Sequence, residues 1–291
     1  MCEETFGGNF SSPSLVKLVN TMFTTYTSKV VMSELPSAWR NYCSHKSGNI
    51  IAFLDSLMNS MIYRGDFDDL SDMVYSTLDG ETVLSSVDIS QLIELEIFKK
   101  TDVFILKWMI DRLEHDDLDA RLNDYSIVDI CKKRRKMHFK DVFSSHYYIL
   151  ENAYYLLKEA RYKPAEELEE ITKNYITKDY IIDQKYRYFY YHYDNVPDSS
   201  IYENLRELVE NVYTNRFLNP LAVAFSRALC ENKAKISLTS QQDFYSRFVK
   251  NSKERTVVII SDAFRYEVGQ TLLKRLMEDE KCTPSIQAMM R

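Results

Sequence analysis

The chain contains 291 residues, a length that allows two domains. Its 45% hydrophobic and 27% charged residues are typical of a globular protein, and its net charge of −6 disfavours a surface that binds nucleic acid over its whole area. Only 6 Gly and 6 Pro accompany 21 Tyr and 15 Phe, so we expect few tight turns and long helices.

The cysteines are odd in number and lie far apart, at Cys2, Cys43, Cys131, Cys230 and Cys282. This pattern indicates neither a zinc ribbon nor a disulfide framework, and it fits a reducing compartment. The first eight residues lack the basic and apolar segments of a signal peptide, and no apolar run is long enough to span a bilayer. We therefore expect a cytoplasmic protein without a membrane segment.

The first 140 residues carry short helical patterns. Residues 50–58 place apolar side chains on one helical face. The segment 103–113 is apolar nearly all round, which predicts a central helix of a bundle. After an acidic turn, residues 126–137 predict a short helix that contains the basic run 132–136.

Helical periodicity becomes clear after residue 140. Apolar and aromatic side chains recur at helical spacing in residues 147–157, 179–194 and 201–212. Residues 197–200, Pro-Asp-Ser-Ser, predict the end of one helix and the cap of the next. The tyrosines in these segments alternate with Leu and Ile, a pattern that favours packing between helices over base stacking.

Three further positions predict helix starts. Pro164 is expected to be the first residue of a helix with acidic residues in its first turn. Asn219 and Pro220 are expected to cap another helix. Ser240 and Asp243 have the spacing of a capping box.

The end of the chain changes character after a linker at residues 251–255. Residues 256–260 are uncharged and rich in β-branched side chains, and a helical pattern follows Asp262 at once. This predicts a buried parallel strand that delivers Asp262 to the edge of an α/β sheet. A single β–α unit cannot bury its own sheet faces, so residues 255–291 are expected to pack on the helices, pair between chains or stay poorly ordered.

The expected fold class is therefore mainly α, with helices followed by the first β–α unit of an α/β domain. The expected domains are a helical region at 1–100, a tyrosine-rich helical domain at 101–250, and the start of the α/β domain at 255–291.

Asp262 is the strongest candidate for chemistry. A carboxylate at a strand end can bind a divalent metal ion, orient a nucleophile, or cap the next helix. Arg265 and Glu267 follow within one turn. They could bind phosphate or orient Asp262, or they could form a solvated ion pair on the helix surface.

The basic run consists of Lys132, Lys133, Arg134, Arg135 and Lys136. It could bind nucleic-acid phosphates or an acidic partner. The alternative is the basic C-terminal end of a helix, favourable with the helix dipole, which pairs with the acidic residues of 114–124. The five histidines show no His-x-x-x-His spacing and are expected to be structural or exposed.

Residues 257–268, Val-Val-Ile-Ile-Ser-Asp-Ala-Phe-Arg-Tyr-Glu-Val, resemble the signature of the PglZ family, a hydrophobic strand followed by Ser-Asp-Ala-Leu-Arg-Tyr-Glu-Val. Further segments resemble elements that occur in the same order in the type A PglZ proteins of bacteriophage-exclusion (BREX) systems: residues 134–138, 186–193, 212–218 and 242–245. The resemblance covers the chain from about residue 15 to its end.

The resemblance implies a hydrolase domain of the alkaline phosphatase superfamily that begins near residue 255. Such a domain holds two divalent metal ions, zinc being expected, beside a Ser or Thr nucleophile. Asp262 matches the first metal-ligand aspartate, and two such ions would activate the nucleophile and stabilise in-line phosphoryl transfer. The nucleophile is expected beyond Arg291, so the resemblance gives no catalytic residue within the chain.

We therefore expect an internal or truncated piece of a metal-dependent phosphatase or phosphoesterase of a BREX system, inactive by itself. Other BREX proteins are the expected partners, DNA could also bind, and no membrane is involved. The alternative is a helical scaffold, formed by residues 1–250, that docks other defence proteins or DNA.

Overall fold

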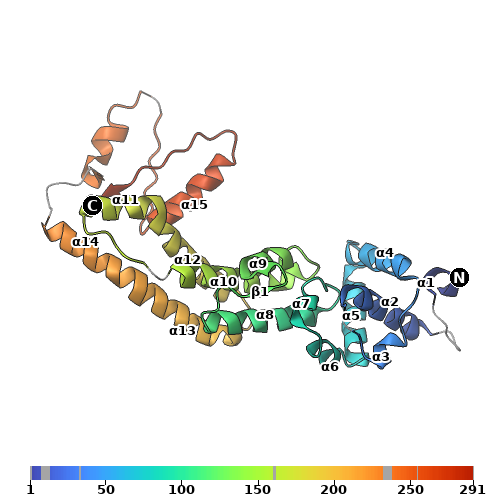
Figure 1. Ribbon diagram of the computed structural model, residues 1–291. Coiled ribbons are helices and arrows are strands. Elements are labelled where there is room, and N and C mark those ends of the chain that lie inside the picture. Colours follow the sequence, from blue (N-terminus) through green and yellow to red (C-terminus); the bar gives the residue numbers. More distant parts are fainter. Residues whose placement is uncertain are drawn as a thin grey trace. The chain divides into compact units, whose positions relative to one another are not determined.

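The computed structural model describes residues 2–7, 14–32, 34–159, 162–231, 238–253 and 255–290. These residues are mainly helical, with two pairs of two-residue strands, which confirms the mainly α class (Figure 1). Close contacts group the chain into two units, Met1–Tyr154 with His192–Tyr202, and Tyr155–Tyr191 with Glu203–Arg291. The three domains expected from the sequence stay a prediction. No described helix combines the length and apolarity needed to cross a bilayer.

The first unit consists of helices of different lengths and one pair of short strands. Its elements are α1 (Cys2–Phe6), α2 (Leu15–Val30), α3 (Ser37–Arg40), α4 (Ser47–Met58), α5 (Arg64–Thr77), α6 (Gly80–Ser85), α7 (Ile89–Leu92), α8 (Lys99–Glu114), the antiparallel strands β1 (Arg121–Leu122) and β2 (Tyr125–Ser126), α9 (Ile127–Arg134) and the start of α10 (Lys140–Glu159). Helices α4, α8, α9 and α10 confirm four helices that the sequence predicts. Helix α9 begins with a capping box between Ser126 and Asp129.

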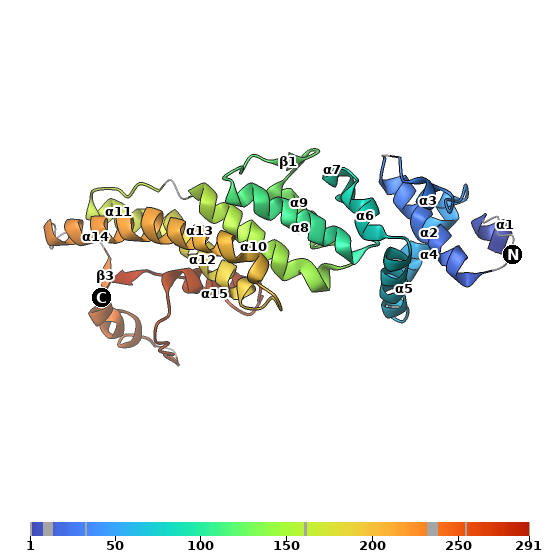
Figure 2. The ribbon, with the colours of Figure 1, turned by 90° about the horizontal axis from the view of Figure 1, so that it is seen from below.

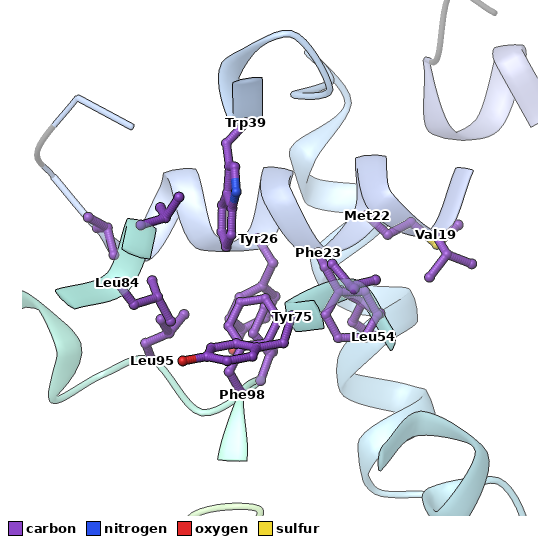
Figure 3. Packing of buried hydrophobic residues seen from close by; sticks show 14 of the residues in the cluster. Val19, Met22, Phe23, Tyr26, Trp39, Leu54, Tyr75, Leu84, Leu95 and Phe98 are labelled. Carbon is purple, nitrogen blue, oxygen red and sulfur yellow. The ribbon is translucent and has the colours of Figure 1, made fainter. Parts of the chain in front are cut away.

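Aromatic side chains fill the core at the N-terminal end of this unit. Phe23, Tyr26, Trp39 and Phe98 lie in one cluster (Figure 3), and the ring centroid of Phe98 lies 5.8 Å from Phe23 and 5.9 Å from Trp39. The indole N–H of Trp39 donates a hydrogen bond to the carbonyl of Leu78 at 2.8 Å, which satisfies the one polar atom of this buried ring.

A buried ion pair joins α8 to α9. Arg134 is 2% exposed, and its guanidinium binds both carboxylate oxygens of Asp102 at 2.9 and 2.7 Å. The remaining Nη1 donates to the carbonyls of Ile93 and Leu95 at 3.0 and 2.9 Å. The hydroxyl of Tyr147 on α10 donates to Asp102 at 2.6 Å. Four segments of the first unit thus meet at one satisfied charge pair, the condition under which a buried pair is tolerated.

The second unit is built from long helices interrupted by wider π-turns. Its elements are α11 (Leu168–Asn174), the π-helix η1 (Tyr175–Asp179), α12 (Tyr180–Tyr193), α13 (Glu203–Val212), the π-helix η3 (Tyr213–Leu218), α14 (Asn219–Glu231), the parallel pair β3 (Thr239–Ser240) and β4 (Met289–Met290), the 3-10 helix η4 (Gln241–Asp243), the π-helix η5 (Tyr245–Val249) and α15 (Tyr266–Met277). The 3-10 helix η2 (Ser200–Tyr202) of the first unit precedes α13.

Two predicted helix starts are wrong. Helix α11 begins at Leu168, after an extended Glu167, and not at Pro164. Pro220 does not follow a break, because α13, η3 and α14 run on without interruption and Asn219 is itself helical. A proline inside a helix clashes with the preceding turn, and the wider π-turn of η3 directly before Pro220 gives room for its ring. The helix break that the sequence suggests is therefore replaced by a π-turn.

The structure does not confirm the strand predicted at residues 256–260. The described residues of this segment have no regular secondary structure, and the side chains of Val257, Ile259 and Ile260 are exposed. No described strand pairs with them, and an unpaired strand has no ladder of hydrogen bonds to hold it. The helix predicted after Asp262 is present as α15, so only the helical half of the expected β–α unit is observed.

The buried pair predicts a large stability difference between two similar substitutions. Asp102→Ala leaves Arg134 charged and unpaired in the core and should lower the free energy of unfolding of the first unit by about 3–5 kcal/mol. Glu94→Ala removes the acidic partner of Lys133 at the surface and should cost less than about 1 kcal/mol. Urea unfolding, followed by hydrogen exchange at α8 amides, measures both. Equal losses would contradict a structural role for the Asp102–Arg134 pair.

Candidate functional site

Asp262 lies in an exposed turn ahead of α15. Its Oδ1 accepts a hydrogen bond from the backbone N–H of Ala263 at 2.9 Å, and Ala263 has a positive φ of 53°. Such a side-chain-to-backbone bond stabilises a tight turn. The N-cap of α15 is Arg265, not Asp262, so Asp262 does not cap this helix. Across the described part of the chain, no group of three His, Cys, Asp or Glu side chains is arranged to hold a metal ion.

Glu267 is completely buried and anchors α15 to α12. Both of its carboxylate oxygens accept from Nε of Arg187, at 3.0 and 2.9 Å. One turn further along α15, the hydroxyl of Thr271 accepts from the side-chain amide of Gln184 at 2.8 Å. Helices α12 and α15 lie side by side in both views (Figures 1 and 2). Glu267 is thus paired with Arg187 inside the second unit. It does not form the solvated ion pair on the helix surface that one alternative predicted, and it does not contact Asp262.

Arg265 lies at the mouth of a cavity of about 490 Å³ between α12 and the turn before α15. Its guanidinium is exposed and has no hydrogen-bond or ion-pair partner among the residues that the structure describes. Tyr186 and Tyr190 on α12 and Ala263 in the turn line the same cavity. The structure therefore brings together Arg265, the paired Glu267 and the backbone beside Asp262.

Two carboxylates on the helices behind this cavity accept hydrogen bonds from tyrosines. Glu210 on α13 accepts from the hydroxyls of Tyr186 and Tyr190 at 2.6 and 2.7 Å, and these bonds hold the pKa of Glu210 below its ordinary value. Tyr186 also stacks on Tyr213, with ring centroids 3.7 Å apart. The tyrosines at helical spacing thus pack between helices as predicted.

Asp183 on α12 repeats the arrangement, accepting from Tyr175 at 2.5 Å and Tyr213 at 2.7 Å. Sequence reasoning missed both carboxylates as hydrogen-bond partners. The spacing of Tyr186 and Tyr190 places them on one helical face, but nothing in the sequence indicates that Glu210, on another helix, lies opposite.

The basic run of α9 divides into buried, paired and exposed residues. Arg134 is buried against Asp102 and cannot reach a phosphate group. Lys133 pairs with Glu94 at 2.7 Å, and Arg135 pairs with Glu151. A signal for Arg134 was present in the sequence, since it falls on the helical face that also carries the buried Ile127, Ile130 and Cys131. The acidic partners come from α8, α10 and the segment before α8, not from residues 114–124 as one alternative predicted.

Lys132 and Lys136 are the exposed members of the run. Both line a surface cavity of about 750 Å³, together with Tyr125 and Asp129. Of the residues that the sequence nominates for nucleic-acid or partner binding, these two lysines are therefore the accessible ones.

His146, His192 and His138 are engaged in packing, hydrogen bonds or ion pairs. His146 shares a hydrogen bond of 2.8 Å with the hydroxyl of Tyr202, and the ring of His192 stacks on Tyr148 with centroids 4.5 Å apart. Burial lowers the pKa of both imidazoles. His138 pairs with Asp68 at 2.6 Å. These contacts agree with the structural role expected from the sequence.

Comparison with known proteins gives one clear relationship. No family model and no solved structure matches the chain. Among curated proteins, it is similar to an alkaline phosphatase-like protein, with 31% identity over an alignment of 302 positions that covers 99% of the chain. The chain is therefore similar to part of an alkaline phosphatase-like protein.

The similar protein is the alkaline phosphatase-like protein PglZ of Bacillus cereus (strain H3081.97). The match confirms the resemblance to PglZ that the motif at residues 257–268 and the helical segments indicate. The chain spans 35% of the length of this curated relative.

The pairing of Glu267 predicts how α15 responds to mutation. Glu267→Gln keeps the shape of the side chain but removes the charge that binds Arg187, so α15 should open more often. We expect amide hydrogen exchange in α15 to rise by at least about tenfold, a change of about 1.4 kcal/mol, with exchange in α8 unchanged.

The matched control is Glu278→Gln at the exposed C-terminal end of the same helix, which should leave exchange in α15 as it is. Arg187→Met should reproduce the effect of Glu267→Gln, and the double variant should add little further. Additive effects would show that the two side chains act independently.

Proposed function

We propose that the chain forms part of a PglZ-like, metal-dependent phosphatase or phosphoesterase that acts in the cytoplasm within a bacteriophage-exclusion defence system. The observation that carries this proposal is the similarity to PglZ over 99% of the chain, which includes the Ser-Asp-Ala-Phe-Arg-Tyr-Glu motif. The expected α/β hydrolase domain, with residues 255–291 as its first β–α unit, is part of the proposal.

Asp262 is the metal ligand in this proposal. Its side chain is exposed, one oxygen accepts from the backbone of Ala263, and the other has no hydrogen bond within the described residues. Such an oxygen suits a divalent cation, zinc by the family resemblance. A single carboxylate does not make a catalytic metal site, which takes at least three protein ligands. The described residues therefore do not fit a complete two-metal site, and we propose that the chain is inactive by itself.

Arg265 and Glu267 have different roles in the proposal. Arg265, exposed beside the cavity and unpaired within the described residues, would bind a phosphate oxygen of the substrate. Glu267 has both oxygens occupied by Arg187 and is a positioning residue. It would fix α15, and with it the turn that carries Asp262.

A chimera tests the proposal. In Bacillus cereus PglZ, the region that matches this chain is replaced by the chain itself, and hydrolysis of p-nitrophenyl phosphate is measured with Zn²⁺, Mn²⁺ or Mg²⁺. We expect metal-dependent hydrolysis that EDTA abolishes and that Asp262→Ala lowers by at least about 100-fold, because a metal ligand is lost. The control Glu278→Ala, at the exposed C-cap of α15, should keep full activity.

Activity that survives both EDTA and Asp262→Ala would refute the metal-dependent mechanism. Calorimetry on the chain itself gives a second measurement. Titration with the same three metal ions should show no specific site, since Asp262 belongs to no group of three potential ligands among the described residues.

A second candidate function is docking of DNA or of other defence proteins by the first unit. The exposure of Lys132 and Lys136 around one surface cavity favours it. The double substitution Lys132→Glu and Lys136→Glu should then weaken capture of the partner, and the loss should shrink as salt is raised. The control Lys107→Glu, at an exposed position of α8, should change capture little. Capture that is the same for all three proteins would exclude this surface.

A further inference from the structure

The first unit contains a second cavity, of about 560 Å³, which shares only Lys136 and Met137 with the cavity of the docking surface proposed above. It lies between α4, the start of α5 and the residues after α9, and its lining includes Tyr26, Asp55, Glu96, Lys136 and Lys140. It belongs entirely to the first unit. Its two acidic residues, Asp55 and Glu96, are half-buried, whereas Lys136 and Lys140 are exposed.

Tyr26 contributes a buried ring with an unused hydroxyl. The residue is 7% exposed and its ring lies in the aromatic core (Figure 3). Among the described residues, nothing forms a hydrogen bond with its hydroxyl, and Tyr26 is one of the residues that line the cavity. Tyr26, Asp55 and Glu96 line the same cavity, and burial together with the carboxylates of Glu96, Asp55 and Glu94 raises the pKa of Tyr26.

The two carboxylates lack a cation. Asp55 is half-buried, and within the described residues its side chain makes neither a hydrogen bond nor an ion pair; burial raises its pKa. Glu96 uses one oxygen to accept from the backbone N–H of His138 at 3.1 Å. A carboxylate that is partly removed from water without a partner carries an uncompensated desolvation cost, which a bound cation would offset.

The basic residues of the lining do not supply that cation. Arg64 pairs with Asp141 at 2.9 Å, and His138, which also lines the cavity, pairs with Asp68 at 2.6 Å. Lys136 and Lys140 are exposed at the edge, and neither is within ion-pair distance of a described carboxylate. The cavity thus offers two acceptors and a hydroxyl to a ligand.

An exposed apolar segment adjoins the cavity. Met61, Ile62 and Tyr63 follow one another in the connection between α4 and α5, all three are exposed, and Met61 also lines the cavity. Consecutive exposed apolar residues beside a polar pocket are a feature of protein-binding surfaces. A small free amine has no apolar group that could pack on them, whereas a polypeptide does.

We propose that this cavity binds a lysine or arginine side chain of a partner polypeptide. The ammonium or guanidinium group donates to Asp55, Glu96 and the hydroxyl of Tyr26, while an apolar neighbour in the partner packs on Met61, Ile62 and Tyr63. The proposal does not depend on the phosphatase function, because neither Asp262 nor any other residue of the second unit takes part.

The test uses the full chain and three capped peptides, acetyl-Leu-Lys-Leu-amide, acetyl-Leu-Arg-Leu-amide and acetyl-Leu-Gln-Leu-amide. Binding is followed by NMR shifts of the residues that line the cavity. We expect a cationic peptide to bind at least about tenfold more tightly than the glutamine peptide, as for a charged pair in a partly desolvated site. Asp55→Asn should remove this preference, and Tyr26→Phe should weaken binding of the cationic peptide severalfold.

The control Asp72→Asn, at an exposed position of α5 outside the cavity, should leave binding unchanged. Lys136→Gln should strengthen binding, because it removes a like charge from the edge. Equal binding of all three peptides, or binding that Asp55→Asn does not change, would overturn the proposal. A site that instead binds inorganic phosphate and loses it in Lys136→Gln would overturn it as well, since the cavity would then recognise anions.

Discussion

The ion pair between Glu267 and Arg187 holds together the part of the chain that carries its most specific motif. The residues before the motif are exposed and have no regular structure, so they cannot position it. Glu267 is fully buried, and a carboxylate in such a place is tolerated only when its charge is paired and its oxygens are bonded. Arg187 satisfies both conditions. Nearby, the hydroxyl of Tyr266 donates to the carbonyl of Ile176 at 3.0 Å, a second link between α15 and the helices before α12. The orientation of the turn at Asp262 therefore follows from contacts made by the residues after it.

The first unit uses the same kind of interaction for a different purpose. Arg134 and Asp102 bring α8, α9, α10 and the segment before α8 to one point. In the sequence, Arg134 is one of five consecutive cations, and charge alone suggests a phosphate-binding surface. Helical periodicity contradicts that reading, because it places Arg134 beside Ile127 and Cys131. When the charge of a residue predicts exposure and its helical position predicts burial, the helical position is the better guide. An arginine on the buried face must then find its partners inside the protein.

The helices could be predicted from the sequence because they depend on nearby residues. The capping box at Ser126 and Asp129 and the apolar run of α8 both act within a few residues. Nearby residues are not enough to predict a strand at 256–260, because a strand needs a neighbouring strand to pair with. None is present for this segment among the described residues. The helix start predicted at Pro220 is wrong for a related reason. The π-turn that accommodates the proline ring depends on the whole helix from α13 to α14 and not on the residues next to Pro220. For the candidate site, the motif indicated Asp262, but the partner of Glu267 lies 80 residues earlier and only the fold reveals it.

The tyrosine–carboxylate pairs of the second unit bear on how its sequence can change during evolution. Glu210 and Asp183 each depend on two hydroxyl donors that come from different turns or different helices. Replacing Tyr186 by phenylalanine would look conservative in size, yet it would leave an ionised carboxylate with one donor fewer in a half-buried place. Substitutions at these positions should therefore occur together: relatives that lose the acid at 210 are free to lose the hydroxyls at 186 and 190, and relatives that keep the acid should keep them. In these helices tyrosine therefore supplies a hydrogen-bond donor that phenylalanine lacks, so the constraint acts on groups of positions and not on single ones.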